Sequence, residues 1–128
     1  MKKALLPNEK LLLIAVFATA PAWASWTQVA THDAADVYVD LATVESVGNS
    51  KQLWMLANFK ERGQGGELSL RSHIEIDCSQ HATRQLKGFG HDEAMGKGQM
   101  MFSVFKPGDW KEIEGTTGDA VMKVVCSS

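Results

Sequence analysis

The most regular pattern in the chain is an alternation of apolar and polar residues between Glu67 and Cys78. The odd positions are polar or charged, and the even positions are Leu68, Leu70, Ser72, Ile74, Ile76 and Cys78. A period of two predicts a β-strand that packs one face on a core and turns the other toward water. The alternation places Cys78 on the buried face, so a segment bonded to it would cover that face.

The segment from Gln52 to Lys60 has apolar residues on both faces over most of its length. They are Leu53, Trp54, Met55, Leu56, Ala57 and Phe59. This pattern predicts a central strand with the C-terminal segment over one face and a partner subunit over the other, or else a plain two-layer core. A homodimer through a sheet face or edge is therefore expected. Residues Glu61 to Gly66 include three glycines and predict a mobile hairpin loop.

Four further strands are predicted from other short segments. They span Trp26–Thr31, Val37–Asp40, Thr83–Phe89 and Gln99–Phe105. Residues Asp40 to Glu45 are expected to form a single helical turn or a bend before Gly48-Asn49 reverses the chain. Together with the two strands above, six strands follow one another through short or glycine-rich connections, which predicts an antiparallel meander.

The last segment favours a helix, with a strand as the alternative. Thr116 and Asp119 have the spacing of a capping box. One broad helical face would contain Val121, Met122, Val124, Val125 and Cys126. The predicted fold class is therefore α+β: a six-stranded antiparallel sheet with a C-terminal helix packed on it.

Residues 1–24 have the pattern of a signal peptide. Lys2-Lys3 precedes an apolar stretch from Leu11 to Ala20, and Ala22-Trp23-Ala24 fits the requirement of signal peptidase for small residues. The stretch is shorter than the roughly 20 apolar residues of a membrane-spanning helix. We expect cleavage before Ser25, where a lipid-anchored protein would need Cys. The mature protein is then one domain, residues 25–128, in the periplasm, at the cell surface or outside the cell, without a lipid anchor.

Charge argues against nucleic acid as a partner. The whole chain has a formal net charge of −2, and residues 1–24 contribute +2, from three lysines and one glutamate, which leaves −4 for residues 25–128. A mildly acidic domain lacks the positive field that binding to phosphate backbones requires.

Both cysteines, Cys78 and Cys126, lie in the predicted mature domain. Such a pair in an oxidising compartment favours a disulfide, which here would tether the C-terminal segment to the sheet. A redox or metal-ligand pair is the alternative, although the chain has no Cys-x-x-Cys spacing.

The sequence contains no recognisable catalytic motif. A Gly-x-Ser-x-Gly motif, a phosphate-binding loop, a His-Glu-x-x-His motif and a dinucleotide fingerprint are all absent, so we predict no enzyme activity and no cofactor. A copper site could draw on His73, His81, His91, Asp92, Glu93, Met95, Met100 and Met101. We prefer a structural interpretation, with His91 in a glycine-rich loop, His73 on a water-facing strand and Met100 in the core.

Other side chains suggest a binding surface more readily than an active site. The carboxylates of Glu75 and Asp77 are interpreted as solvated rather than catalytic. The tryptophans Trp26, Trp54 and Trp110 could form a ligand platform, but core or sheet packing is preferred for each. The better surface candidates are Arg71 and Arg84, because arginine is enriched at protein interfaces.

The order and spacing of many of these residues resemble the surface-adhesin protein E-like family of exported bacterial proteins. The matching residues are Trp26, Tyr38, Asp40, Thr43-Val44, Trp54, Glu75-Ile76-Asp77-Cys78, Arg84, Met95-Gly96-Lys97-Gly98, Trp110 and Cys126. The resemblance covers essentially the whole mature chain. It implies a six-stranded antiparallel sheet with a C-terminal helix tethered by a disulfide, and an adhesin function, since the best-known member binds host matrix and plasma proteins.

This chain departs from the family pattern in two places. It lacks the lipid-attachment Cys of a surface lipoprotein, and Glu114-Gly115-Thr116 stands where members often have a Pro-Gly-Ser-like sequence. The first departure weakens the adhesin interpretation, because function depends on sites rather than on folds.

The functional hypothesis is noncatalytic binding of a host or envelope protein. Its candidate contacts are Arg71, Arg84, Glu61 and Arg62, which are charged residues on predicted strands and a mobile loop. The alternatives are a periplasmic structural or stress-related protein without a host ligand, and a small periplasmic metal-binding protein.

Overall fold

The computed structural model describes residues 25–127, so the predicted signal peptide, residues 1–24, lies outside the described residues. The helices and strands are β1 (Thr27–Thr31), β2 (Ala35–Val47), β3 (Ser50–Phe59), β4 (Ser69–Asp77), β5 (Ala82–His91), the 3-10 turn η2 (Ala94–Gly96), β6 (Met100–Val104), β7 (Lys111–Glu112) and α2 (Gly115–Cys126).

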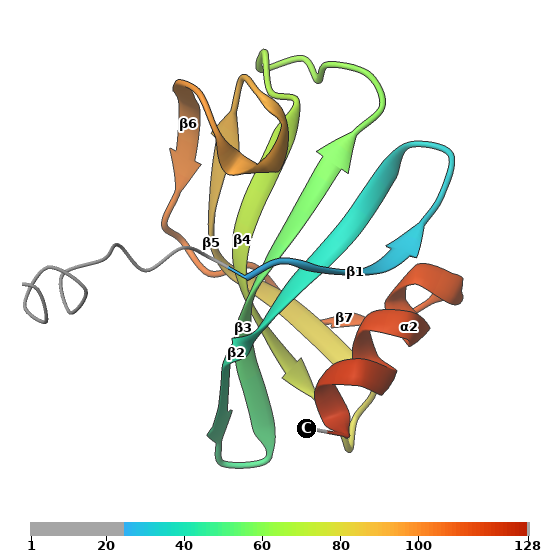
Figure 1. The fold of residues 1–128 in the computed structure, drawn as a ribbon. Coiled ribbons are helices and arrows are strands. Elements are labelled where there is room, and N and C mark those ends of the chain that lie inside the picture. The colour runs from blue at the N-terminus through green and yellow to red at the C-terminus, as the bar shows by residue number, and fades with distance from the viewer. Residues whose placement is uncertain (1–24, 128) are drawn as a thin grey trace, which may run out of the picture.

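Strands β1 to β6 form a meander in which each strand pairs antiparallel with its neighbours in sequence (Figure 1). The predicted six-stranded antiparallel sheet with a C-terminal helix is therefore confirmed. A seventh strand, β7, was not predicted: it pairs with β5 and is only two residues long. Two residues are too few for an alternation to be recognised.

The hydrophobic core lies between one face of the sheet and α2, which packs over β1 and β2 (Figure 1). Its buried members come from both layers and are Val37, Val39, Leu53, Ile74, Ile76, Ile113, Val121 and Val125. Ile74 and Ile76 are two of the even positions of the predicted alternation, and both point to the helix side. Each fully buried aliphatic side chain stabilises the fold by about 1.5–3 kcal/mol.

The region from Asp40 to Glu45 corrects one expectation. It forms no helical turn but continues β2, whose pairing with β3 shifts register between these two residues. The Thr43 hydroxyl donates to the Asp40 carbonyl (2.6 Å) and accepts from the Trp54 backbone N–H (3.0 Å). A side-chain oxygen therefore replaces a main-chain acceptor at the irregularity, and the strand continues beyond it.

The start of α2 corrects another expectation. Glu114 is the N-cap residue, with an extended backbone and no side-chain hydrogen bond to the helix. The predicted capping box of Thr116 and Asp119 is wrong, because Thr116 already lies within the helix. The first turn is instead fixed by packing: a Cβ on Gly118 would lie 2.8 Å from the Ile113 side chain, so only glycine fits there without displacement.

A disulfide joins Cys78, just beyond β4, to Cys126, the last residue of α2, across a Cα–Cα distance of 6.0 Å. Cys78 lies at the position that the alternation assigned to the buried face, and both cysteines pack against the core. The bridge therefore holds the end of α2 on the sheet, as predicted.

Replacing Cys78 or Cys126 with Ser should lower the free energy of unfolding by about 2–4 kcal/mol, because the bridge closes a long loop in the unfolded chain. Urea titration measures this change. Wild-type protein under reducing conditions is the matched control and should show the same loss. Two reactive thiols in the natively folded, oxidised protein would contradict the prediction.

Candidate functional site

The sheet face opposite α2 carries a cluster of aromatic and cationic side chains. Across β3, β4 and β5, Trp54 pairs with His73, which pairs with Lys87, and one step along the sheet Arg71 pairs with Phe89. Directly opposed residues of antiparallel strands point to the same face, so these five side chains lie together. We call Trp54, Arg71, His73, Lys87 and Phe89 the open-face cluster.

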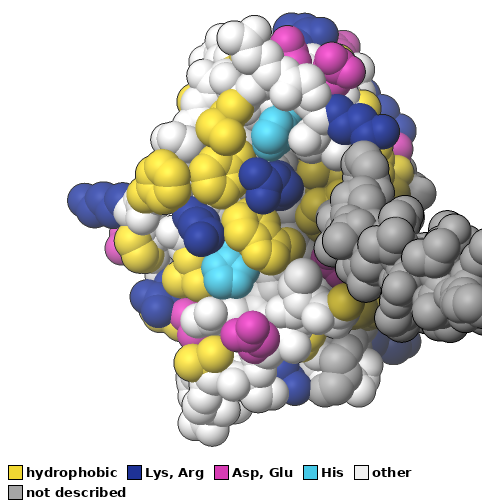
Figure 2. Space-filling view, turned by 60° about the vertical axis from the view of Figure 1, so that its left-hand side comes forward, with side chains coloured by type: hydrophobic (Ala, Val, Ile, Leu, Met, Phe, Trp, Pro, Cys, Tyr) yellow, Lys and Arg dark blue, Asp and Glu magenta, His cyan; other side chains and the backbone are white. Residues whose placement is uncertain are grey.

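The members of the cluster stack on one another. The ring of Trp54 lies 5.0 Å from that of His73 and 6.1 Å from that of Phe89. The Arg71 guanidinium carbon lies 4.9 Å from the Trp54 ring and 4.7 Å from the Phe89 ring, and the Lys87 ammonium lies 5.5 Å from Trp54. These are cation–π distances. Figure 2 shows this face, with cationic side chains and histidines set among hydrophobic ones.

An exposed aromatic side chain extends the cluster toward the sheet edge. Phe105, just after β6, packs edge-on against Phe89 at 5.6 Å and remains 68% exposed. Aromatic side chains that remain accessible beside cations are typical of protein interfaces. Most of the Phe105 ring is therefore accessible beside the open-face cluster.

The two arginines predicted as contacts have different partners. Arg84 donates from Nε to one oxygen of the buried Glu75 carboxylate (2.9 Å), and one of its terminal nitrogens forms an ion pair with the same oxygen (2.8 Å). Its guanidinium also lies 4.7 Å from the Trp110 ring. Arg71 has ring contacts but no acceptor among residues 25–127. Burial lowers the pKa of its guanidinium, which nevertheless stays charged.

The other two predicted contacts, Glu61 and Arg62, lie in the loop between β3 and β4 and are exposed. Arg62 donates to the backbone carbonyls of Gly66 and Asp92, both at 2.8 Å. It therefore connects two loops and is held by its own chain. The structure brings Arg71 and Arg84 onto one face of the sheet and leaves Glu61 and Arg62 at one end of it (Figure 1).

The loop that contains η2 covers part of the same face. The side-chain oxygen of Asn58 accepts from the Met95 backbone N–H (2.7 Å), and the Ser69 hydroxyl accepts from Gly96 N–H (2.9 Å). Met95 has a left-handed backbone, with φ of 62°. This loop lies over Leu56, which is fully buried. The chain itself therefore covers part of the second apolar face that the sequence assigned to a partner or a core.

His91 corrects a further expectation. It ends β5 rather than lying in a loop, is only 6% exposed, and neither ring nitrogen has a hydrogen-bond partner among residues 25–127. Burial, and then the charge of Arg71, lower its pKa, while Asp92 opposes the shift. Burial and Lys87 also lower the pKa of His73. Both rings are therefore neutral at neutral pH.

The three histidines of the suggested copper site do not converge. His73 and His91 belong to the open face, whereas His81 lies at the β4–β5 turn, 3.8 Å from Asp119. The Met95 sulfur accepts a hydrogen bond from Asn58. Within residues 25–127, no three His, Cys, Asp or Glu side chains are grouped as a metal site would require.

Three expectations about burial are wrong, and two contact residues were not predicted. Met100 is 49% exposed instead of lying in the core, Trp110, expected to pack, is 43% exposed, and Glu75, interpreted as solvated, is only 6% exposed. Lys87 and Phe89 were overlooked as contacts. Their alternation with His91 along β5 was the signal that could have placed all three on one face.

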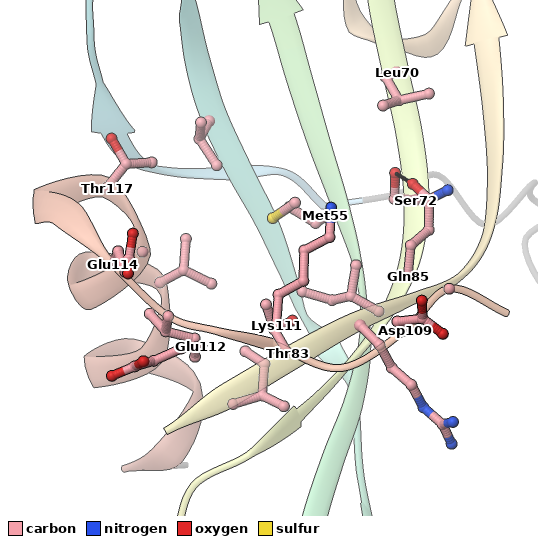
Figure 3. A pocket seen from close by; sticks show the side chains of 18 residues that line it. Met55, Leu70, Ser72, Thr83, Gln85, Asp109, Lys111, Glu112, Glu114 and Thr117 are labelled. Carbon is pink, nitrogen blue, oxygen red and sulfur yellow. Dashed lines mark hydrogen bonds between the residues drawn. The ribbon is translucent and has the colours of Figure 1, made fainter. Parts of the chain in front are cut away.

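A separate cleft of about 790 Å³ lies on the helix side of the sheet (Figure 3). Its floor includes Met55, Leu70 and the hydrogen-bonded pair Ser72 and Gln85 (2.9 Å), and Thr117 of α2 forms part of a wall. The described lining contains neither His nor Cys. Its lining combines apolar side chains with the charged residues Asp109, Lys111, Glu112 and Glu114.

The architecture defines a class of protein: a single-sheet α+β domain whose C-terminal helix is held by a disulfide, with an aromatic and cationic face left open. The model of the family "Surface-adhesin protein E" matches residues 26–127, and the chain belongs to this family. Family membership supports an adhesin-like role. None of the described helices has the length and apolarity needed to cross a membrane.

Solved structures show the same fold. One structure of Haemophilus influenzae protein E superimposes with a TM-score of 0.64 and 13% identity over 84% of this chain and 87% of that one. A second crystal form of the same protein superimposes with a TM-score of 0.62 and 12% identity, over 84% of this chain and 91% of that one. For a selenomethionine form, the TM-score is 0.63 and the identity 14%, over 84% of this chain and 89% of that one. No curated protein matches the sequence. At these identities the likeness establishes the fold alone.

Stability should fall as the pH drops below 6.5, the ordinary pKa of histidine. The folded-state pKa of His91 lies lower than this value, so the unfolded chain binds the proton first and acid favours unfolding. The free energy of unfolding stops falling on this account once the pH is below the folded-state pKa of His91. Urea titrations across this range should show a smaller pH dependence for His91→Leu, since His73 retains its own contribution.

The matched control is Val47→Ser, an exposed substitution that removes no titratable group and should leave the pH dependence unchanged. If His91→Leu retains the full pH dependence of the wild type, burial of this ring is not its cause.

Proposed function

We propose that the protein is an exported, noncatalytic binding protein that recognises a host or envelope protein through the open face of its sheet. The observation that carries the proposal is the open-face cluster, which leaves stacked aromatic rings and cations accessible opposite α2. Aromatic residues and arginine are the residues enriched at protein interfaces. Membership of the surface-adhesin protein E family supports the same conclusion.

The proposed location is the periplasm, the cell surface or the extracellular medium, after removal of residues 1–24 and without a lipid anchor. The proposed contacts are Arg71 and Arg84 on the sheet, with Glu61 and Arg62 in the β3–β4 loop. Phe105 joins them because most of its ring is exposed beside Phe89. The proposal requires no cofactor.

The purified protein should bind saturably to at least one extracellular matrix, plasma or envelope protein in a surface-binding assay. Phe105→Ser should weaken this binding tenfold or more, because central aromatic contacts commonly contribute about 2 kcal/mol. The matched control is Val47→Ser, which removes another exposed apolar side chain, at the β2–β3 hairpin outside the cluster.

Protease treatment of intact cells tests the surface location at the same time. Protection from protease, together with failure to capture any matrix or plasma protein, would favour the periplasmic structural alternative.

We also propose that two copies associate through the edge of the sheet at β6. This edge strand has no charged residue, and Met100, Met101 and Val104 are exposed. Uncharged apolar edges favour pairing with another strand. Sedimentation should show a dimer that Val104→Lys weakens. A monomer mass at all micromolar concentrations would contradict this proposal.

A further inference from the structure

Two cations of the open-face cluster have no carboxylate partner in the part of the chain that the structure describes. Arg71 and Lys87 both approach the Trp54 ring, at 4.9 and 5.5 Å. The described ion pairs involve other residues, namely Lys60 with Asp36, His81 with Asp119, and Arg84 with Glu75. The cluster therefore holds positive charge that its own chain leaves unneutralised.

We infer that the open-face cluster binds an acidic polypeptide segment, with a carboxylate of the partner held by Arg71 and Lys87. This inference rests on the proposed function, because it names the chemistry of the partner that the same face would recognise. The segment would place apolar or aromatic side chains beside its carboxylate, since Phe89 and the exposed Phe105 lie next to the cations.

The geometry of Arg71 prepares it for a carboxylate. The Trp54 and Phe89 rings contact the guanidinium group from 4.9 and 4.7 Å, which restricts its orientation before any ligand arrives. Stacking uses the face of a guanidinium, whereas its N–H donors lie in its plane and remain able to bind an anion. A pre-oriented arginine loses less conformational entropy when a carboxylate binds.

Arg84, in the same sheet, combines a contact to an aromatic ring with a bound carboxylate. It lies over the Trp110 ring, as Arg71 lies over Trp54, and it holds Glu75 by a hydrogen bond from Nε (2.9 Å) and an ion pair from a terminal nitrogen (2.8 Å). Arg71 has the ring contacts of Arg84 but not the carboxylate. An incoming Asp or Glu side chain would complete the same arrangement.

The local charges favour one or two carboxylates over a polyanion. The domain carries a formal net charge of −4 once residues 1–24 are subtracted. Glu45 and Glu75 lie close enough to His73 for their charges to act on its pKa, and burial keeps that ring neutral at neutral pH. A sulfated polysaccharide would bring many anionic groups to an acidic domain with two unpaired cations on this face, whereas a segment with one or two carboxylates would match the number of these cations.

The test uses a fluorescently labelled peptide that alternates Phe and Glu, and a counterpart with Gln at each Glu position. Fluorescence anisotropy should show tighter binding of the Glu peptide to the intact protein. Arg71→Gln and Lys87→Gln should each weaken this binding about tenfold, as expected for a charge-assisted hydrogen bond. The matched control is Lys123→Gln on α2, which removes the same charge from an exposed site and should bind normally.

Several outcomes would overturn the inference. These are equal binding of the Glu and Gln peptides, wild-type affinity in both Arg71→Gln and Lys87→Gln, or tighter Arg71-dependent binding of heparin than of the Glu peptide. Lys87→Gln keeps the test valid if Arg71→Gln fails to fold. A protein partner that depends on Phe105 but not on Arg71 or Lys87 would contradict only this inference, whereas the absence of any captured protein would contradict the proposed function itself.

Discussion

The sheet has two faces, and the part of the chain that the structure describes has one α-helix to cover them. On one face, α2 buries aliphatic residues of the central strands under Val121 and Val125. On the other, the loop containing η2 covers Leu56, and the side chains of Arg71 and Lys87 lie over the half-buried ring of Trp54. The first face therefore forms an aliphatic core beside a cleft, whereas the second is covered partly by long, charged side chains.

This division explains why the sheet could be predicted from sequence more reliably than its surroundings. The alternation in β4 correctly placed Ile74, Ile76 and Cys78 on a covered face, but the opposite face, which it assigned to water, buries Ser69 and Glu75. The extension of β2 could not be inferred, because its irregularity depends on the Thr43 hydroxyl bonding to β3, a residue pair distant in sequence. Local propensity cannot report such a tertiary contact.

The candidate site shows the same limit at the level of single side chains. Arg71 and Arg84 were selected for the same reason, their residue type, yet one is paired with a buried Glu75 and the other with two aromatic rings. Arg62 is bound to backbone carbonyls of two loops. Sequence identifies an arginine, whereas its availability to a ligand depends on which acceptors the fold brings near it.

The order of strands has a consequence for how the domain assembles. Because each of β1 to β6 pairs with its neighbour in sequence, the sheet can grow by successive hairpins that close short loops. Docking of α2 is different, since Cys126 must find a residue 48 positions earlier in the chain. With only two cysteines, the bridge between Cys78 and Cys126 is the one intramolecular disulfide that this sequence allows, so its formation reports that the C-terminal segment has reached the end of β4.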